Sequence, residues 1–528
     1  MLKNLALLLL LFLNLYVLTL HIGVVAPLSL TEKDLIGIEG QLIKTGESGH
    51  THIVLEGSSY KRGLEFSRLT KDLLLLQENK LLEKFKSFIP NFFVQKLFFH
   101  GAMIWFYGLE EHIDQDSLKE MQGVSIHAPE EYNYLADPLT RQAAYHILHE
   151  VGQLFVDEDF SDAGCFVAAI KNEDQSWVIG RNFDFDIENI FDDKKILKWS
   201  FPKVGHDYLS VIWAGMVGVV TGVNSQGIYA SINAAGSDSF SRLGTPTTII
   251  VKNILLKASS IKEAQEIILE QKPFITEVFV IADRKTGEVI TVENSPSKQI
   301  FIQKSNSFVL SNHLESPEFK EDKVNIKRIN ELTTMHRYKR GVELLEQVDH
   351  EEGIKSVLSI LRDKSLYKEA KPRIGNRGTI DALIASHSIL FDTKENTFYV
   401  SNADGTSGDY IGYDLTESFD KRRPVIATVL KQEEDLSSAE YRNISKLLEG
   451  LPRVQESIDN KECTLAEDQI KTFKNNKIDH YEISLVMGNY YKTCKEDLNL
   501  AKKYWKLALG QKPAFLKKAE YLKGLLNE

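Results

Sequence analysis

Three residues near the middle of the chain have the types and spacing of a nucleophilic site. Cys165 opens a short apolar run, Arg181 follows 16 positions later, and Asp184 follows 19 positions later. If the two runs pair as a hairpin, the three side chains lie on neighbouring strands. A guanidinium beside the sulfur favours the thiolate form, and a carboxylate can orient a nearby base. The spacing therefore predicts an activated thiol.

The residue before the cysteine suggests where the base comes from. Gly164 precedes Cys165, so cleavage of the bond between them gives Cys165 a free α-amine in addition to its thiol. An unperturbed α-amine has a pKa of about 7.7 to 8.0, which suits a general base near neutral pH. One residue then serves as both nucleophile and base.

Plainer interpretations fit the same three residues. A single cysteine on an apolar strand is most often a small buried hydrophobic residue. Arg181 and Asp184 could equally form a surface ion pair that closes a turn. The choice depends on the surrounding elements and on the other motifs of the chain.

The elements that must position these residues change character at Cys165. Before it the pattern is mainly helical, with a strand pair at 41–44 and 51–55 and helices at 64–86 and 139–155. After it, helical patterns at 249–271 and 323–345 lie between short β-branched or aromatic runs. These runs predict strands at 165–170, 177–179, 209–221, 228–232, 277–282, 289–293, 299–303, 308–310, 382–391 and 397–401. Sheets with helices packed outside them are expected.

The motif around the cysteine resembles a known enzyme family. Gly164-Cys165 followed by Gly180-Arg181-Asn182-Phe183-Asp184 is similar to the pattern of the cysteine N-terminal-nucleophile hydrolases. That family includes penicillin V acylase, conjugated bile salt hydrolase, acid ceramidase, N-acylethanolamine acid amidase and the isopenicillin N acyltransferase-like peptidases. The resemblance covers residues 50 to 410, through the segments 55–63, 221–228, 231–233, 311–313 and 378–380.

The resemblance implies a fold and a reaction. The fold is α+β, an αββα sandwich of antiparallel sheets, made as a precursor that cuts itself between Gly164 and Cys165. Residues 31–164 then form a mainly helical pro-segment, and residues 165–430 form the catalytic core. The mature enzyme is expected to cleave the carbon–nitrogen bond of a linear amide through a thioester acyl-enzyme.

The resemblance also assigns roles by position in the motifs. Cys165 is the nucleophile, Arg181 and Asp184 are its partners, and Asn233 and Asn312 contact the transition state. Side-chain amides at strand ends can donate to an oxyanion, and losing one such donor costs roughly 3 to 4 kcal/mol in comparable enzymes. An asparagine in a turn can also simply cap a strand.

Two further positions bear on the site. The family has a late arginine near the nucleophile, for which Arg377, just before Gly378, is predicted here and Arg373 is the alternate. The chain departs from the commoner Cys-Thr-Ser opening, since Phe166 and Val167 follow Cys165. The large Phe166 affects the shape of the pocket and hence the substrate.

Composition excludes several classes of protein. At 528 residues two or three folded units are expected, and the 43% hydrophobic, 26% charged balance excludes a disordered or polytopic membrane chain. The formal net charge of −11 and the lack of a long basic run argue against a nucleic-acid partner. The three cysteines, Cys165, Cys463 and Cys494, are too few for a disulfide framework or a four-cysteine zinc site.

No cofactor or metal is expected. His146, His149 and Glu150 suggest a metal helix, but Gln153 stands where the zincin pattern needs its second histidine. The chain also has no glycine-rich phosphate loop after a strand.

The N-terminus is strongly apolar. Residues 4 to 31 form a run of 28 without Asp, Glu, Lys or Arg. This length favours a membrane anchor at residues 1–30, with a cleaved signal peptide or a buried helix as alternatives. Lys3 is the only charge before the run, which keeps the N-terminus in the cytoplasm by the positive-inside rule. We expect a membrane-anchored or secreted protein whose body is extracytoplasmic.

The last segment, residues 436–528, reads as helical. Gly488, Ala501 and Trp505 fall where a tetratricopeptide-like helix pair places small and aromatic residues, although an ordinary helical extension fits as well. A single repeat cannot bury its own face, so the segment must dock on the rest or on a protein partner. Cys463 and Cys494 could pair here or remain free.

The sequence thus favours an amidohydrolase acting on a small-molecule N-acyl amide. An acyltransferase that passes the acyl group to an amine shares the same acyl-enzyme. A non-catalytic binding or assembly protein that acts through its helical tail is the third interpretation.

Overall fold

The computed structural model describes residues 25–44, 46, 48–154, 164–184, 194–348, 352–432, 436–476 and 478–527. Most of the predicted anchor or signal peptide, residues 1–24, lies outside the described residues. Within the described part of the chain, no helix is both long and apolar enough to cross a membrane.

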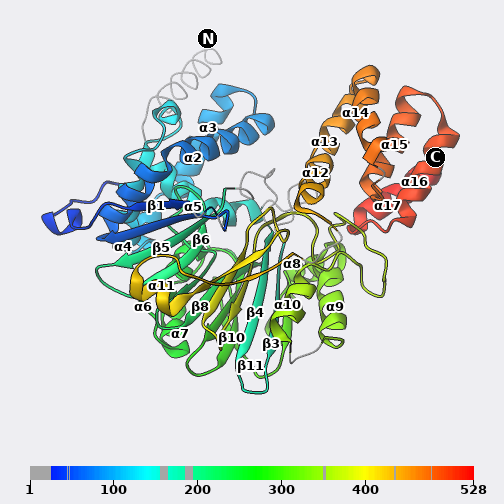
Figure 1. Cartoon of the computed structure of the whole chain (residues 1–528). Coiled ribbons are helices and arrows are strands. Elements are labelled where there is room, and N and C mark those ends of the chain that lie inside the picture. Colours follow the sequence, from blue (N-terminus) through cyan, green and yellow to red (C-terminus); the bar gives the residue numbers. More distant parts are fainter. Residues whose placement is uncertain are drawn as a thin grey trace, which may run out of the picture.

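Two sheets form the centre of the molecule (Figure 1). Neighbouring strands are antiparallel, except that β2 pairs with β5 in parallel. The nine-stranded sheet has the order β1 (Gln41–Lys44), β2 (Thr51–Gly57), β5 (Ile196–Pro202), β6 (Tyr208–Ile212), β7 (Thr221–Asn224), β8 (Ile228–Ala234), β9 (Glu277–Asp283), β10 (Glu288–Asn294), β11 (Gln299–Lys304). The seven-stranded sheet has the order β12 (Phe308–Leu310), β3 (Cys165–Lys171), β4 (Trp177–Asp184), β13 (Ala385–Asp392), β14 (Thr397–Ser401), β15 (Tyr410–Asp414), β16 (Ile426–Leu430).

Alternation along the strands builds the layers. Val167 and Ile179 of one sheet pack against Leu209 and Val280 of the other in a shared core. The residue next to Val167, Phe166, points the opposite way and packs with the outer helices. Because side chains alternate between faces with a period of two, each buried strand serves both the inter-sheet core and a helical layer.

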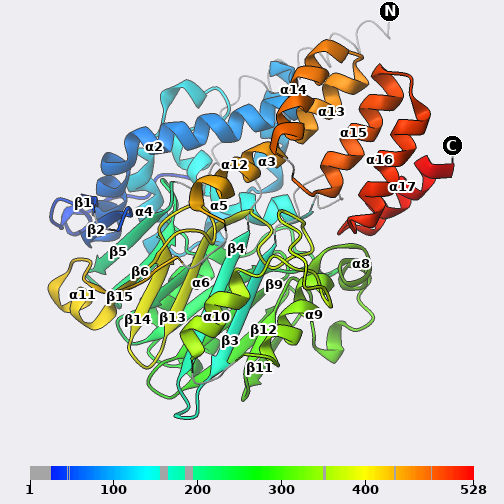
Figure 2. The same cartoon turned by 45° about the vertical axis from the view of Figure 1, so that its right-hand side comes forward.

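Helices cover both outer faces, so the architecture is the predicted αββα sandwich (Figure 2). The nine-stranded sheet carries α4 (Gln115–Ser125), α5 (Pro138–Leu154), α6 (Thr247–Lys257) and α7 (Ile261–Glu270), with α2 (Ser59–Phe88) and α3 (Phe92–Trp105) beside them. The seven-stranded sheet carries α9 (Thr334–Leu345) and α10 (Gly353–Leu361), while α8 (Lys323–Glu331) and α11 (Leu415–Lys421) lie nearby.

Several predicted elements are subdivided in the structure. The helical pattern 249–271 is two helices, because Ser260 caps α7 by accepting a hydrogen bond from the backbone N–H of Glu263. The pattern 323–345 likewise divides into α8 and α9. The run 209–221 is two strands, separated by a turn that includes Gly215 at φ 77°. Strands β5, β15 and β16 were not predicted.

The segment before Cys165 is integrated with the core. It is mainly helical, as expected, but β1 and β2 extend the nine-stranded sheet through the parallel pairing of β2 with β5. Helices α2 and α4 cross in close contact at Gly63 and Gly123. A Cβ atom on Gly63 would lie 2.0 Å from the carbonyl oxygen of Glu120, so the crossing requires glycine there.

The C-terminal segment is helical, as predicted, and docks on the core. It comprises α12 (Ser438–Glu449), α13 (Leu451–Asp459), α14 (Cys463–Asn476), α15 (Tyr481–Cys494), α16 (Leu498–Gly510) and α17 (Leu516–Asn527). His480 Nε2 lies 3.2 Å from the carbonyl oxygen of Gly375, and Asn376 Nδ2 donates to the carbonyl oxygen of Lys512 at 2.9 Å.

Two contacts shape this helical segment. Cys463 and Cys494 form a disulfide that joins the start of α14 to the end of α15. Gly488 packs against the indole of Trp505, where a Cβ would lie 2.3 Å from the ring. The predicted hairpin is therefore present as α15 and α16, and its tetratricopeptide character stays a prediction.

Candidate active site

Strand parity brings the predicted site residues together between the two sheets. Along β3 and β4, Cys165 and Arg181 share the inward parity of Val167 and Ile179. Along β8, Asn233 shares the inward parity of Tyr229. Because both sheets face one core, these side chains from distant parts of the chain meet there.

Three hydrogen bonds hold the backbone around Cys165 in place. The N–H of Cys165 donates to Asn312 Oδ1 at 2.9 Å, and its carbonyl oxygen accepts from Arg337 Nη1 at 2.9 Å. The carbonyl oxygen of Gly164 accepts from the N–H of Asp184 at 2.8 Å. The Gly164–Cys165 peptide bond is thus held as a continuation of the β3–β4 ladder.

The thiol of Cys165 is buried, and its surroundings favour the protonated form. Arg181 Nη2 lies 3.8 Å from Cys165 Sγ, and Cys165 is only 1% exposed. Burial raises the pKa of the Cys165 thiol, while Arg181 and the N–H of Ala234 oppose this and the charge of Asp184 adds to it. In the uncut chain desolvation therefore outweighs the guanidinium. The predicted activation of the thiol concerns the cut chain and stays a prediction.

The side chain of Arg181 links the two sheets by hydrogen bonds. Its guanidinium donates to the carbonyl oxygen of Val220 at 3.0 Å, to Thr221 Oγ1 and to the carbonyl oxygen of Ile232. Its Nε donates to Asn233 Oδ1 at 3.3 Å. The alternative of a surface ion pair with Asp184 is wrong, because Arg181 is completely buried.

Asp184 lies directly beside the scissile bond. A Cβ atom on Gly164 would lie 2.9 Å from Asp184 Oδ2 and 3.4 Å from Arg337 Nη2. Only glycine fits this gap without displacing the carboxylate. Asp184 is therefore positioned to hold an amine released at Cys165.

The two predicted asparagines make different contacts. Asn312 Oδ1 accepts from Cys165 and its Nδ2 donates to the carbonyl oxygen of Ala234 at 2.8 Å, so this amide is committed to the backbone. Asn233 Nδ2 is buried and has no hydrogen-bond partner among the described residues. A buried donor without a partner is costly, so Asn233 is the amide available to a ligand oxygen.

A family model confirms the kind of protein. The model for acyl-coenzyme A:6-aminopenicillanic acid acyl-transferase matches residues 170–407. The chain is related to the N-terminal-nucleophile hydrolases. This relationship makes amide hydrolysis or acyl transfer its general kind of reaction.

Solved structures were compared with the chain as well. The Caenorhabditis elegans ortholog of N-acylethanolamine-hydrolyzing acid amidase is 14% identical, covering 44% of this chain and 92% of its own, with a TM-score of 0.31. A variant of the conjugated bile acid hydrolase of Clostridium perfringens is 13% identical, covering 52% of this chain and 98% of its own, with a TM-score of 0.34. No curated protein sequence matches the chain.

The arginine from the later part of the chain that contacts Cys165 is Arg337. It donates to the carbonyl oxygen of Cys165 and, through Nη2, to Asn312 Oδ1 at 2.8 Å. Arg377, the residue predicted for this place, instead lies within electrostatic reach of Tyr481 on α15. Arg373, the alternate, pairs with Glu369 at 3.0 Å.

One sequence signal for Arg337 existed. Thr334, Arg337 and Gly341 form the buried stripe of α9 at helical spacing, so an arginine occupies a position normally apolar. A charge at such a position points to a buried partner. The motif Gly378-Thr379-Ile380 points instead to Arg377, the residue before it.

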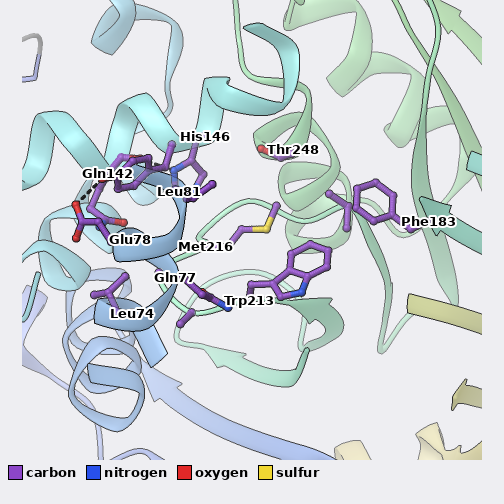
Figure 3. Close-up of a pocket in the computed structure, with 14 residues that line it drawn as sticks. Leu74, Gln77, Glu78, Leu81, Gln142, His146, Phe183, Trp213, Met216 and Thr248 are labelled. Atoms are coloured by element: carbon purple, nitrogen blue, oxygen red, sulfur yellow. Dashed lines mark hydrogen bonds between the residues drawn. The ribbon is translucent and has the colours of Figure 1, made fainter. Parts of the chain in front are cut away.

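A pocket beside the nucleophile is lined mainly by apolar side chains (Figure 3). Phe183, the antiparallel partner of Cys165 in the ladder, forms one side, and residues of α2 and α5 form the other, with Trp213 and Met216 between them. The cavity volume is about 110 Å³. A concave, mainly apolar site of this kind suits an apolar part of a small-molecule ligand.

His146, the described member of the possible metal-binding set, is not placed for a metal, and the side chains of His149 and Glu150 lie outside the described part of the structure. His146 Nε2 accepts from the N–H of Val217 at 2.8 Å, and Nδ1 lies 2.7 Å from the carbonyl oxygen of Gln142. Both ring nitrogens are therefore used by the backbone. Among the described residues, no group of three or more potential ligands gathers at one point.

Proposed function

We propose that the chain cuts itself between Gly164 and Cys165 and then hydrolyses linear N-acyl amides through a thioester on Cys165. One observation carries this proposal. The Gly164–Cys165 bond lies in a buried frame of donors and acceptors, beside Asn233 Nδ2, a donor for which the described part of the chain offers no partner.

The geometry supports self-cleavage by an N-to-S shift. Cys165 Sγ attacks the carbonyl carbon of Gly164, and the negative charge that forms on the oxygen is stabilised by the N–H of Asp184, 2.8 Å away. The carbon–nitrogen bond breaks, the thiol proton passes to the leaving nitrogen, and water hydrolyses the thioester. The products are a Gly164 carboxylate and a Cys165 with a free thiol and α-amine.

The second reaction uses the new amine. Held by Asn312 Oδ1 and the nearby Asp184, the amine takes the thiol proton as sulfur attacks the acyl carbon of the substrate. Asn233 Nδ2 and the N–H of Ala234 donate to the oxyanion. The amine then protonates the departing nitrogen, and water releases the acid from the thioester.

The apolar pocket supports an apolar acyl group. Each buried methylene contributes about 0.8 kcal/mol, so kcat/KM is expected to rise about threefold to fourfold per carbon until the pocket is full. A flat profile from acetyl to dodecanoyl amides, or faster cleavage of peptide amides, would contradict this preference.

Acyl transfer to an amine is the second candidate. The matching family model is named for an acyl-transferase, and the acyl-enzyme is the same. Product analysis with and without an amine acceptor separates the two reactions. The non-catalytic interpretation has no observation in its favour, since the thiol, Arg181 and Asn233 meet in one site.

An extracytoplasmic location is proposed with this function. The disulfide between Cys463 and Cys494 fits an oxidising compartment, as does the charge-free run at residues 4–31. Mass spectrometry of the native protein under non-reducing conditions tests the disulfide.

The decisive test is N-terminal sequencing and intact mass of the purified protein. A second N-terminus at Cys165 is expected for the natural sequence and a single chain for Cys165→Ala. Incubation with an N-acyl amide should then add one acyl mass to the 165–528 fragment, whose only free cysteine is Cys165. An active protein that stays uncut, and takes up no acyl group, would overturn the proposal.

A further inference from the structure

Helix α3 has an inverted distribution of polarity. It buries the polar Gln95 and His100, which are 4% and 5% exposed, whereas Phe93 is 65% exposed. Gln95 Nε2 donates to the carbonyl oxygen of Ile89 at 2.8 Å, and His100 Nδ1 lies 2.7 Å from the carbonyl oxygen of Lys96. A helix that faces water has the opposite arrangement, with its polar side chains outside.

The exposed side chains of α3 and the residues after it form one apolar set, here called the α3 surface. Single exposed apolar side chains are ordinary, whereas a contiguous group of this size marks an interaction site. In Figure 1, α3 lies beyond α2, on the side away from the strands. The α3 surface consists of Phe92, Phe93, Val94, Leu97, Phe98, Ile104, Trp105 and Tyr107.

The charge of this region is opposite to that of the whole chain. Residues 84–109 contain three lysines, Lys84, Lys86 and Lys96, and no Asp or Glu, although the chain carries a net charge of −11. The same 26 residues contain nine Phe, Trp or Tyr. Aromatic and leucine side chains accompanied by lysine are the composition of helices that lie in the membrane–water interface.

The N-terminal apolar run enters the described structure at the same place. Val25, within the charge-free run 4–31, packs in one cluster with Met103 of α3 and Phe106 just after it. The described end of the run therefore shares a core cluster with the helix that carries the α3 surface. A lipid surface can accept both at once, whereas a soluble protein partner has no need of the run.

We propose that the α3 surface docks on the interface of a lipid bilayer that contains anionic lipids. Its aromatic side chains enter the boundary between headgroups and acyl chains, while Lys86 and Lys96 face the phosphates. Helix α2 lines the pocket with Leu74 and Leu81 and leads directly into α3. Docking thus sets the pocket close to the membrane. This inference is independent of the proposed reaction, because it concerns binding alone.

Trp105 provides a direct readout in the full chain. It is 51% exposed, whereas the other four tryptophans, Trp177, Trp199, Trp213 and Trp505, are at most 5% exposed. Vesicles of phosphatidylcholine and phosphatidylglycerol that carry bromine on the upper acyl chain should quench the fluorescence of Trp105. The variant Trp105→Phe should abolish this quenching even where the protein still binds vesicles.

Substitution separates the α3 surface from the N-terminal run. Phe93→Asp together with Phe98→Asp should weaken vesicle binding by at least about tenfold and remove the quenching of Trp105. Val204→Asp, at an equally exposed apolar residue outside α3, is the matched control and should change neither. Lys86→Glu with Lys96→Glu should weaken binding to anionic vesicles more than to phosphatidylcholine vesicles.

Two results would overturn the proposal. One is unquenched Trp105 in vesicle-bound natural protein, which would assign membrane binding to the N-terminal run alone. The other is a detergent-free dimer that Phe93→Asp with Phe98→Asp converts to monomer without altering vesicle binding, which would assign the α3 surface to a second copy of the chain. Amide hydrolysis by the same variants on a soluble substrate is expected to stay unchanged.

Discussion

At the residue scale, the buried side chains of the candidate site make different contacts with Cys165 and its surroundings. Arg181 ties the two sheets together and lies against the sulfur, Asn312 and Arg337 hold the backbone of Cys165, and Asn233 keeps a free donor. Burial raises the pKa of the thiol against the effect of Arg181. In the proposed mechanism, turnover therefore depends on the α-amine that cleavage would release.

The pH dependence of kcat/KM tests the role of this amine. The proposed mechanism needs the amine in its neutral form, so kcat/KM is expected to fall as pH drops through the pKa of the amine. The unperturbed pKa of an α-amine is about 7.7 to 8.0. A nearby carboxylate favours the ammonium form and so raises the pKa of the amine. Asp184→Asn should therefore shift the acidic side of the kcat/KM profile to lower pH. The same substitution should also reduce turnover. Initial rates from pH 5 to 9 on self-cut protein check this. An unshifted acidic side of the profile would leave Asp184 without a role at the amine.

Arg337 provides a second test, with Arg377 as its matched control. Arg337→Lys keeps the charge but loses the two-pronged contact to Cys165 and Asn312, so kcat/KM should fall about tenfold to a hundredfold. Arg377→Lys should stay within about twofold, since the structure gives the place at Cys165 to Arg337. Thermal unfolding of both variants shows whether the fold is intact. Equal losses in the two variants would contradict the assignment.

At the element scale, buried ion pairs bind the N-terminal segment to the core. Glu120 on α4 lies 3.2 Å from Arg62 of α2, 3.3 Å from Lys198 of β5 and 2.9 Å from Lys252 of α6. These cations hold the pKa of Glu120 well below its usual range despite full burial. Two of them belong to the part after Cys165, so the two fragments should remain together after cleavage.

Neutralising this carboxylate tests the connection. Glu120→Gln leaves three buried cations with less countercharge and should lower the free energy of unfolding by about 3 to 5 kcal/mol. Glu266→Gln, at an exposed pair with Lys262, should change it by less than about 1 kcal/mol. Thermal or urea unfolding, with gel filtration of the cut protein, measures both effects. Equal stability of the two variants would show that the cluster does not hold the fragments.

At the scale of the whole molecule, a buried cluster joins β2 of one sheet to β14 and β15 of the other. His50 Nδ1 lies 2.7 Å from the hydroxyl of Tyr413 and its Nε2 lies 2.9 Å from the carbonyl oxygen of Ser401. His52 lies between Trp199 and Tyr413. Burial lowers the pKa of His50 to about 4 and that of His52 to about 3.

These shifts predict how stability depends on pH. The unfolded chain binds protons on these histidines below pH 6.5, whereas the folded chain does not until about pH 4, so stability is complete above pH 6.5 and declines as pH falls. Each residue contributes a loss of about 2 kcal/mol at most between pH 6.5 and 5. The double variant His50→Gln, His52→Gln should reduce the dependence of stability on pH. The control variant His112→Gln, at an exposed histidine, should leave that dependence unchanged. Unfolding midpoints at pH 7 and pH 5 provide the comparison, and an unchanged slope in the double variant would refute it.

The sequence by itself determined the chemistry-bearing residues on the strands. The spacing of Cys165, Arg181 and Asp184, together with the period of two, specifies which side of a hairpin each occupies, whatever the hairpin packs against. It likewise predicted α2, α5 and most strands of both sheets, because their apolar periods are local. The order of those elements predicted sheets with helices outside them, and the αββα class was implied by the resemblance to the family.

Only the tertiary structure decided which distant groups meet. Arg337 reaches Cys165 because α9 packs on the seven-stranded sheet, and no spacing along the chain encodes that approach. The contacts of Asn312 depend on how the two sheets stack, and so does the position of Asn233 Nδ2, which has no partner among the described residues. The thiol pKa depends on a balance between desolvation and charge, and burial is a property of the packed molecule rather than of any motif.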